Sequence, residues 1–123
     1  MTSTVPFAVP FAVPVEDVEL TRDPGFPGEV LAGSPRMSSA VLWQSGDREV
    51  VRGVWQVEPS TFTWAFSRNE VLVVLRGSAR VRVEGGPELE LRPGVVAGFR
   101  PGDRTTWTVT ETLRKFFTVD SVA

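Results

Sequence analysis

Hydrophobic and polar positions alternate along most of the chain beyond residue 40, with the two-residue period of a β-strand. Ala79, Val81 and Val83 alternate with Arg80 and Arg82, which predicts a strand with one buried and one solvent-exposed face. Short turns rich in Gly, Pro, Ser, Asn and Asp separate successive segments, and no window has the period of an amphipathic helix. The pattern predicts an antiparallel barrel or sandwich of strands over 40–44, 48–58, 61–66, 70–77, 79–84, 88–92, 95–99, 105–109 and 113–119.

One of these segments departs from the alternation. Residues 70–77, EVLVVLRG, are apolar almost throughout. A strand that is covered on both faces has this composition, because neither face needs to be polar. We therefore expect 70–77 to be a central strand with both faces buried.

The N-terminal residues follow a different pattern, a short tandem repeat with a proline at every fourth position from Pro6 to Pro14. This spacing blocks a helix and favours extended chain. Phe7 and Phe11 lie between the prolines. Two interpretations stay open: a solvated tail, or an extended arm whose rings pack on the domain or on a second subunit.

The following residues, 21–39, are dense in Pro, Gly and Ser, which predicts a loop. The expected organisation is therefore an extended Pro-rich arm and loop over 1–39 and one β-barrel domain over 40–123. The N-terminus lacks the basic start and the cleavage site of a secretory signal. We expect a cytoplasmic protein.

Composition excludes several function classes. The 123 residues carry a formal charge of -2 without a basic block, which argues against nucleic acid as a partner. No apolar run approaches the ~20 residues of a membrane-spanning helix, so no membrane partner is expected. The chain has no Cys and no His. Disulfides, thiolate catalysis, a Ser-His-Asp triad and a zinc site of imidazole or thiolate ligands are therefore excluded.

The spacing around Glu70 carries a resemblance to a known family. Glu70 and Gly77 enclose six residues, VLVVLR, the spacing that ends the first motif of cupins. The aromatic residues Phe62, Trp64 and Phe66 precede this Glu as they do in the small single-domain cupins that group with ureidoglycine aminohydrolase-like proteins and the ethanolamine-utilisation cupin.

A second motif, about forty residues further on, is similar to the closing run of the same group. Together the motifs cover roughly residues 48–119. The resemblance implies an all-β fold, an antiparallel cupin jelly-roll barrel. The residues of this second motif are Trp107, Val109, Glu111, Arg114, Lys115 and Phe117.

The resemblance also locates the positions at which many cupins bind a metal ion with His residues. Aligned on Glu70, these positions fall at Thr63, Ala65 and about Thr106. One carboxylate with two hydroxyls is a poor transition-metal site. We therefore expect no metal and no cofactor, and none of the dioxygenase chemistry of metal-binding cupins.

Glu70 is the main candidate for catalysis. On the resemblance it points into the barrel mouth, where an apolar cup disfavours the charged form of a carboxyl group and makes it a usable general acid or base near neutral pH. Thr63 would assist it, and an Arg at the rim could steady an oxyanion. The alternative is a Glu70 held by Arg or Thr at a strand edge for structural reasons.

The alternation places Thr63 and Ala65 on one face of their strand and Phe62, Trp64 and Phe66 on the other. If Thr63 faces the cup, the three aromatic side chains pack on the opposite side, against a second sheet, the arm or another subunit. The candidate ligand-contacting residues are Trp55, Ala65, Leu72, Arg104, Thr106 and Trp107.

These observations leave three functions open. The first is a metal-independent isomerase, cyclase, lyase or dehydratase with Glu70 as acid or base, for which a small, largely apolar secondary metabolite would be a suitable substrate. The second is a non-catalytic module that binds a small molecule, and the third is a subunit that functions only within a complex. An exposed aromatic stripe and an apolar arm favour a homodimer.

Overall fold

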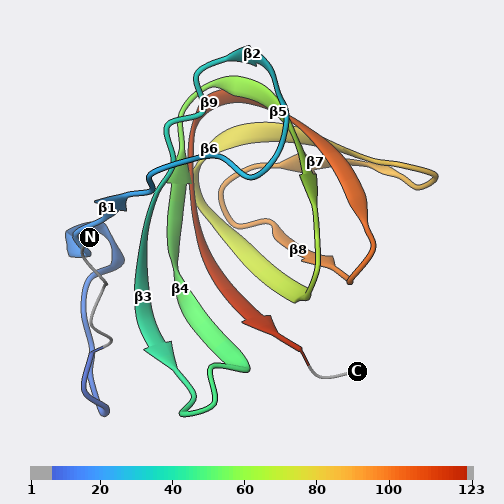
Figure 1. Cartoon of the computed structure of the whole chain (residues 1–123). Coiled ribbons are helices and arrows are strands. Elements are labelled where there is room, and N and C mark those ends of the chain that lie inside the picture. The colour runs from blue at the N-terminus through green and yellow to red at the C-terminus, as the bar shows by residue number, and fades with distance from the viewer. Residues whose placement is uncertain (1–6, 122–123) are drawn as a thin grey trace.

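The alternating segments form one curled sheet of nine strands in which all pairings are antiparallel (Figure 1). This computed structural model describes residues 7–121. The all-β fold predicted from the pattern is confirmed. A single 3₁₀ turn, η1 (Val15–Asp17), precedes the strands within the described residues. The strands are β1 (Thr21–Arg22), β2 (Val30–Gly33), β3 (Ser38–Gln44), β4 (Val50–Val57), β5 (Ser60–Ala65), β6 (Asn69–Val83), β7 (Glu88–Leu91), β8 (Val96–Phe99) and β9 (Arg104–Asp120).

Two long strands replace four predicted ones. β6 spans the two segments expected over 70–77 and 79–84, and β9 spans the last two expected segments. The strands pair along most of their length, from Asn69 opposite Asp120 to Val83 opposite Thr105. The register shifts near Gly77, and such bulges let a long strand bend, so β6 and β9 curve around the molecule (Figure 1).

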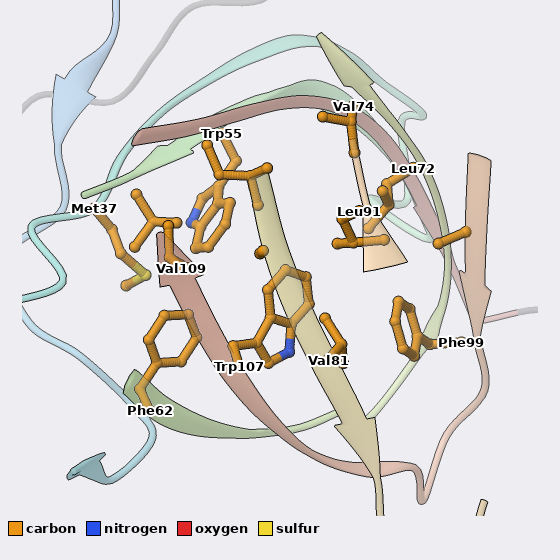
Figure 2. Packing of buried hydrophobic residues seen from close by; sticks show 14 of the residues in the cluster. Met37, Trp55, Phe62, Leu72, Val74, Val81, Leu91, Phe99, Trp107 and Val109 are labelled. Atoms are coloured by element: carbon orange, nitrogen blue, oxygen red, sulfur yellow. The ribbon is translucent and has the colours of Figure 1, made fainter. Parts of the chain in front are cut away.

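The interior of this curled sheet holds the main hydrophobic cluster. Figure 2 shows Trp55 of β4, Phe62 of β5 and Trp107 of β9 pointing into it, with Leu72 and Val74 of β6 beyond them. The Phe62 and Trp107 rings are stacked, with centroids 6.0 Å apart. Large rings from three different strands therefore share one side of the interior.

The expectation that 70–77 is covered on both faces is wrong. Glu70 and Leu72 point inward, but Val71 is 49% exposed. β4 is covered on both faces. Its residue Trp55 belongs to the interior cluster, whereas the adjacent Val54 belongs to a second buried cluster on the other side of the sheet.

The N-terminal segment covers that second cluster. Val18 is buried in it, and Val15 packs against it. Arg114 of β9, itself buried, donates hydrogen bonds to the carbonyl oxygens of both residues, at 3.0 and 3.1 Å. The described part of the arm therefore lies on its own barrel. Phe7 and Phe11 stack on each other and remain 40% exposed, so these two rings are not the main anchor.

The predicted loop over 21–39 contains short strands. β1 pairs with β3, and β2 pairs with β5. Two to four residues give too little pattern to predict a strand in a Pro- and Gly-rich sequence. Within residues 7–121 no helix is long and apolar enough to cross a membrane.

Candidate ligand cavity

A cavity of about 690 Å³ lies between the inward faces of β4, β5 and β9 and the segment that precedes β3. This volume is typical of small-molecule sites. Aromatic side chains form most of its wall, and the polar side chains on it are few. The aromatic lining residues are Phe26, Trp55, Phe62, Trp64, Phe66, Trp107 and Phe117, and the ionisable ones are Asp23, Glu70 and Lys115.

Two of the ionisable residues form a buried ion pair. Glu70 on β6 and Lys115 on the neighbouring β9 both point inward, and Lys115 Nζ donates to Glu70 Oε2 at 2.5 Å. Their side chains are only 11% and 8% exposed. The pair brings one positive and one negative charge into the wall of a largely aromatic cavity, where neither charge is well hydrated.

Aromatic faces surround the ammonium group of Lys115. Its Nζ atom lies 4.6 Å from the ring centroid of Trp55, 5.5 Å from that of Trp107 and 5.8 Å from that of Phe117. Cations are attracted to the faces of such rings. These contacts hold the amine in the wall of the cavity beside Glu70.

Sequence reasoning identified Glu70 but missed Lys115 as a site residue. From the sequence, Lys115 was named only as one residue of the second family motif. A signal was present, because Lys115 alternates with Leu113 and Phe117 and therefore shares their inward face. A Lys in phase with buried apolar residues needs a partner, and Glu70 supplies it.

The predicted orientation of β5 is wrong. Phe62, Trp64 and Phe66 line the aromatic cavity, whereas Thr63 and Ala65 do not. The Thr63 hydroxyl oxygen instead accepts a hydrogen bond from the Glu29 backbone N–H at 2.9 Å, beside β2. Successive side chains of a strand point to opposite faces, so Thr63 and Ala65 fall on the face opposite the three aromatic side chains.

A neighbouring hollow contains Thr63 and Ala65. It also has a volume of about 690 Å³ and is formed with Gly28 and Glu29. Its lining includes Glu70, but most of its residues are not those of the aromatic cavity. Thr63 and Glu70 therefore share this neighbouring hollow, whereas Thr63 does not line the aromatic cavity with Lys115; a catalytic role for Thr63 stays a prediction.

The other predicted ligand contacts divide into two groups. Trp55 and Trp107 line the aromatic cavity, as expected, and their contact with a ligand stays a prediction. Leu72 is 1% exposed in the packed core and does not reach the cavity. Arg104 and Thr106 lie beside a smaller hollow, where the Arg104 guanidinium is 3.7 Å from the Glu84 carboxylate.

A hydrogen-bonded chain fixes the wall formed by Trp107. The Trp107 indole N–H donates to the Thr105 hydroxyl oxygen at 2.9 Å, and that hydroxyl donates to the Trp64 carbonyl oxygen at 2.6 Å. Thr105 is buried, and sequence reasoning did not single it out. Because the indole N–H is satisfied within the wall, Trp107 presents its apolar ring to the cavity.

The segment before β3 closes one side of the cavity. The Phe26 ring makes edge contacts with Phe62 and Trp64, with centroids 4.9 and 5.8 Å apart. Asp23 holds this segment in place, because its carboxylate accepts from the Ser39 hydroxyl and its N–H donates to the Met37 carbonyl. The Pro- and Gly-rich region is therefore part of the site.

The donor atoms of this cavity do not suit a transition metal. The inward positions on β5 belong to Trp64 and Phe66, whose rings offer no lone pair to a metal ion. The Glu70 carboxylate is engaged by the Lys115 ammonium. Among residues 7–121 no three His, Cys, Asp or Glu side chains are grouped so that they could hold an ion. The expected independence of metal stays a prediction.

Comparison with known proteins agrees with this architecture. A EutQ protein from Clostridium difficile superimposes with a TM-score of 0.70 at 16% identity, over 89% of this chain and 86% of that one. A putative ethanolamine utilization protein from Salmonella typhimurium gives 0.61 at 20% identity, over 72% of both chains. Ectoine synthase from P. lautus gives 0.61 at 15% identity, over 72% of this chain and 66% of that one.

At these identities the three structures show a shared fold alone. No curated protein sequence matches this chain. Residues 44–117, more than half of the chain, match the model of the EutQ-like cupin domain. The all-β jelly-roll fold, the two motifs and this match lead to one conclusion: the chain belongs to the EutQ-like cupin family.

Proposed function

We propose that this protein acts on a small, largely apolar organic molecule held in the aromatic cavity, without a metal ion, and that Glu70 transfers the proton. The observation that carries the proposal is the ion pair of Glu70 and Lys115, buried in the wall of a cavity of about 690 Å³. The reaction would be of the isomerase, cyclase, lyase or dehydratase type.

Stability does not account for this pair. Burying two charges costs several kcal/mol per ion, and their attraction often does no more than offset that cost. Apolar residues of similar size would fill the same positions at least as well. An ion pair in a cavity wall therefore suggests a use for the charges, and pairs of this kind recur in active sites.

The two groups would have complementary roles. The Glu70 carboxylate would remove a proton from the bound molecule and return it at another atom. The Lys115 ammonium, 2.5 Å away, would stabilise negative charge that develops on an oxygen of the substrate. The rings of Trp55 and Trp107 would exclude water, which strengthens both effects.

A second function is binding without turnover. The aromatic lining favours it equally, because stacking surfaces and a few polar groups are sufficient for recognition. In that case the ion pair would only orient the ligand. The fold permits both uses, since likeness to an ectoine synthase is a likeness of fold.

Replacement of Glu70 separates the two functions. We would incubate the protein with a panel of small aromatic and alicyclic compounds and follow products by mass spectrometry. If Glu70 transfers the proton, Glu70→Gln lowers turnover by about 10²-fold or more while ligand affinity changes little. Glu84→Gln is the matched control, because Glu84 is an exposed carboxylate outside the cavity. Turnover unchanged in Glu70→Gln would contradict the catalytic role.

A further inference from the structure

We infer that Lys115 is a nucleophile that forms an imine with an aldehyde or ketone in the aromatic cavity. The inference rests on the proposed function, because it places the reacting molecule in the same cavity, and it names the substrate class. It also assigns to Lys115 a covalent role in addition to the electrostatic one.

The position of the amine is the first support. Lys115 lines the cavity in which the reacting molecule would bind, and only 8% of its side chain is exposed. The faces of Trp55, Trp107 and Phe117 surround the amine. Most lysines extend into water, and lysines that form imines in enzymes sit in poorly hydrated pockets of this kind.

The second support is a base in contact with the amine. A lysine attacks a carbonyl carbon only after it loses a proton, and Glu70 Oε2 lies 2.5 Å from Nζ to accept it. The two groups are in direct hydrogen-bond contact, so the proton has only a short distance to move before the amine attacks.

The chemistry balances with these two groups alone. The ammonium proton moves to Glu70, and the free amine attacks the carbonyl carbon, so a C–N bond forms while the C=O π electrons move to oxygen. After a proton passes from nitrogen to that oxygen, the product is a neutral carbinolamine. Glu70 then protonates its hydroxyl, which leaves as water, and the C=N bond forms. The iminium ion next to the Glu70 carboxylate restores the ion pair.

This step would explain how an apolar cavity serves proton-transfer reactions. An iminium ion withdraws electrons from the adjacent carbon, which makes the hydrogens on that carbon acidic. Glu70 is placed to remove such a hydrogen, as isomerisation and elimination require. The aromatic lining favours a substrate with a largely apolar body.

The test uses an unusual feature of the chain: Lys115 is its only lysine. We would incubate the folded protein at neutral pH with benzaldehyde and cyanoborohydride, which reduces an imine to a stable benzylamine. Intact mass then counts benzyl groups, and peptide mapping distinguishes Lys115 from the N-terminal amine. The same reaction in urea gives the rate for an unfolded, freely exposed Lys115.

The expected result is faster labelling of Lys115 in the folded protein than in urea. A lysine with only a structural role is protected by burial and would react more slowly when folded. We expect Glu70→Gln to slow the labelling of Lys115 by about 10²-fold and the control Glu84→Gln to leave it unchanged. Lys115→Arg, with folding checked by circular dichroism, should restrict the label to the N-terminus.

Labelling of Lys115 that is slower in the folded protein than in urea, or unaffected by Glu70→Gln, would overturn the inference. Binding of an unreactive analogue tests the proposed function independently of the imine. If the unreactive analogue benzyl alcohol still binds the cavity while Lys115 resists labelling, only the imine is overturned. If benzyl alcohol does not bind either, the proposed function is overturned as well.

Discussion

At the scale of single residues, the site depends on two side chains of opposite charge that sequence reasoning treated unequally. Glu70 could be predicted because its spacing to Gly77 belongs to a family motif. The alternation indicated an inward Lys115, but its contact with Glu70 could not be predicted, because pairing across β6 and β9 depends on the register of two strands separated by many residues. Thr63, the predicted catalytic partner of Glu70, does not line the aromatic cavity, because alternation defines two faces of a strand without saying which face is inside, and its catalytic role stays a prediction.

A double substitution tests whether the pair serves function rather than stability. Glu70→Gln or Lys115→Met alone leaves one buried group without its partner and should lower the free energy of unfolding by about 3–5 kcal/mol. Glu70→Leu combined with Lys115→Met removes both charges. We expect the double variant to be about as stable as the original chain in urea unfolding, and to be inactive. A double variant less stable than both single variants would show that the pair is structural.

At the scale of elements, most strands were predicted in the right places, but two of the predicted breaks between strands do not exist. The pattern predicted two strands each where the structure has the single long, bent strands β6 and β9. In β6 a bulge around Gly77 interrupts the alternation without ending the strand, so it resembles a turn in the sequence. The two-residue strand β1 and the four-residue strand β2 carried too little pattern to be found.

Gly77 should be the most sensitive glycine on these bends. It has a positive φ of 87°, and a Cβ atom there would lie 2.0 Å from the Thr112 carbonyl oxygen of β9. We expect Gly77→Ala to destabilise the protein by about 2–4 kcal/mol, measured by thermal or urea unfolding. Gly85→Ala is the matched control, because Gly85 also has a positive φ but open space around it. Equal losses in the two variants would contradict a steric role for Gly77.

At the scale of the whole molecule, the same sheet separates two apolar environments. The inner face of β4 contributes Trp55 to the cavity, and its outer face packs against the N-terminal segment. The aromatic stripe of β5, which favoured a homodimer, lines the cavity instead. A homodimer therefore stays a prediction that rests on the exposed Phe7 and Phe11.

The cavity is the central feature of this arrangement. The indole signals of the Trp residues can show whether a ligand binds in it. Trp55, Trp64 and Trp107 line the cavity, whereas Trp43 does not and packs against Arg52. Each indole N–H gives its own signal in a ¹H–¹⁵N correlation spectrum. A titration with a neutral aromatic molecule therefore contains its own control.

The most direct test is to record these spectra while benzyl alcohol is added. If the cavity binds small, largely apolar molecules, the signals of Trp55, Trp64 and Trp107 should shift together and saturate. The signal of Trp43 should stay in place. Saturable shifts confined to Trp43, or no saturable shift at the three cavity indoles, would contradict the account.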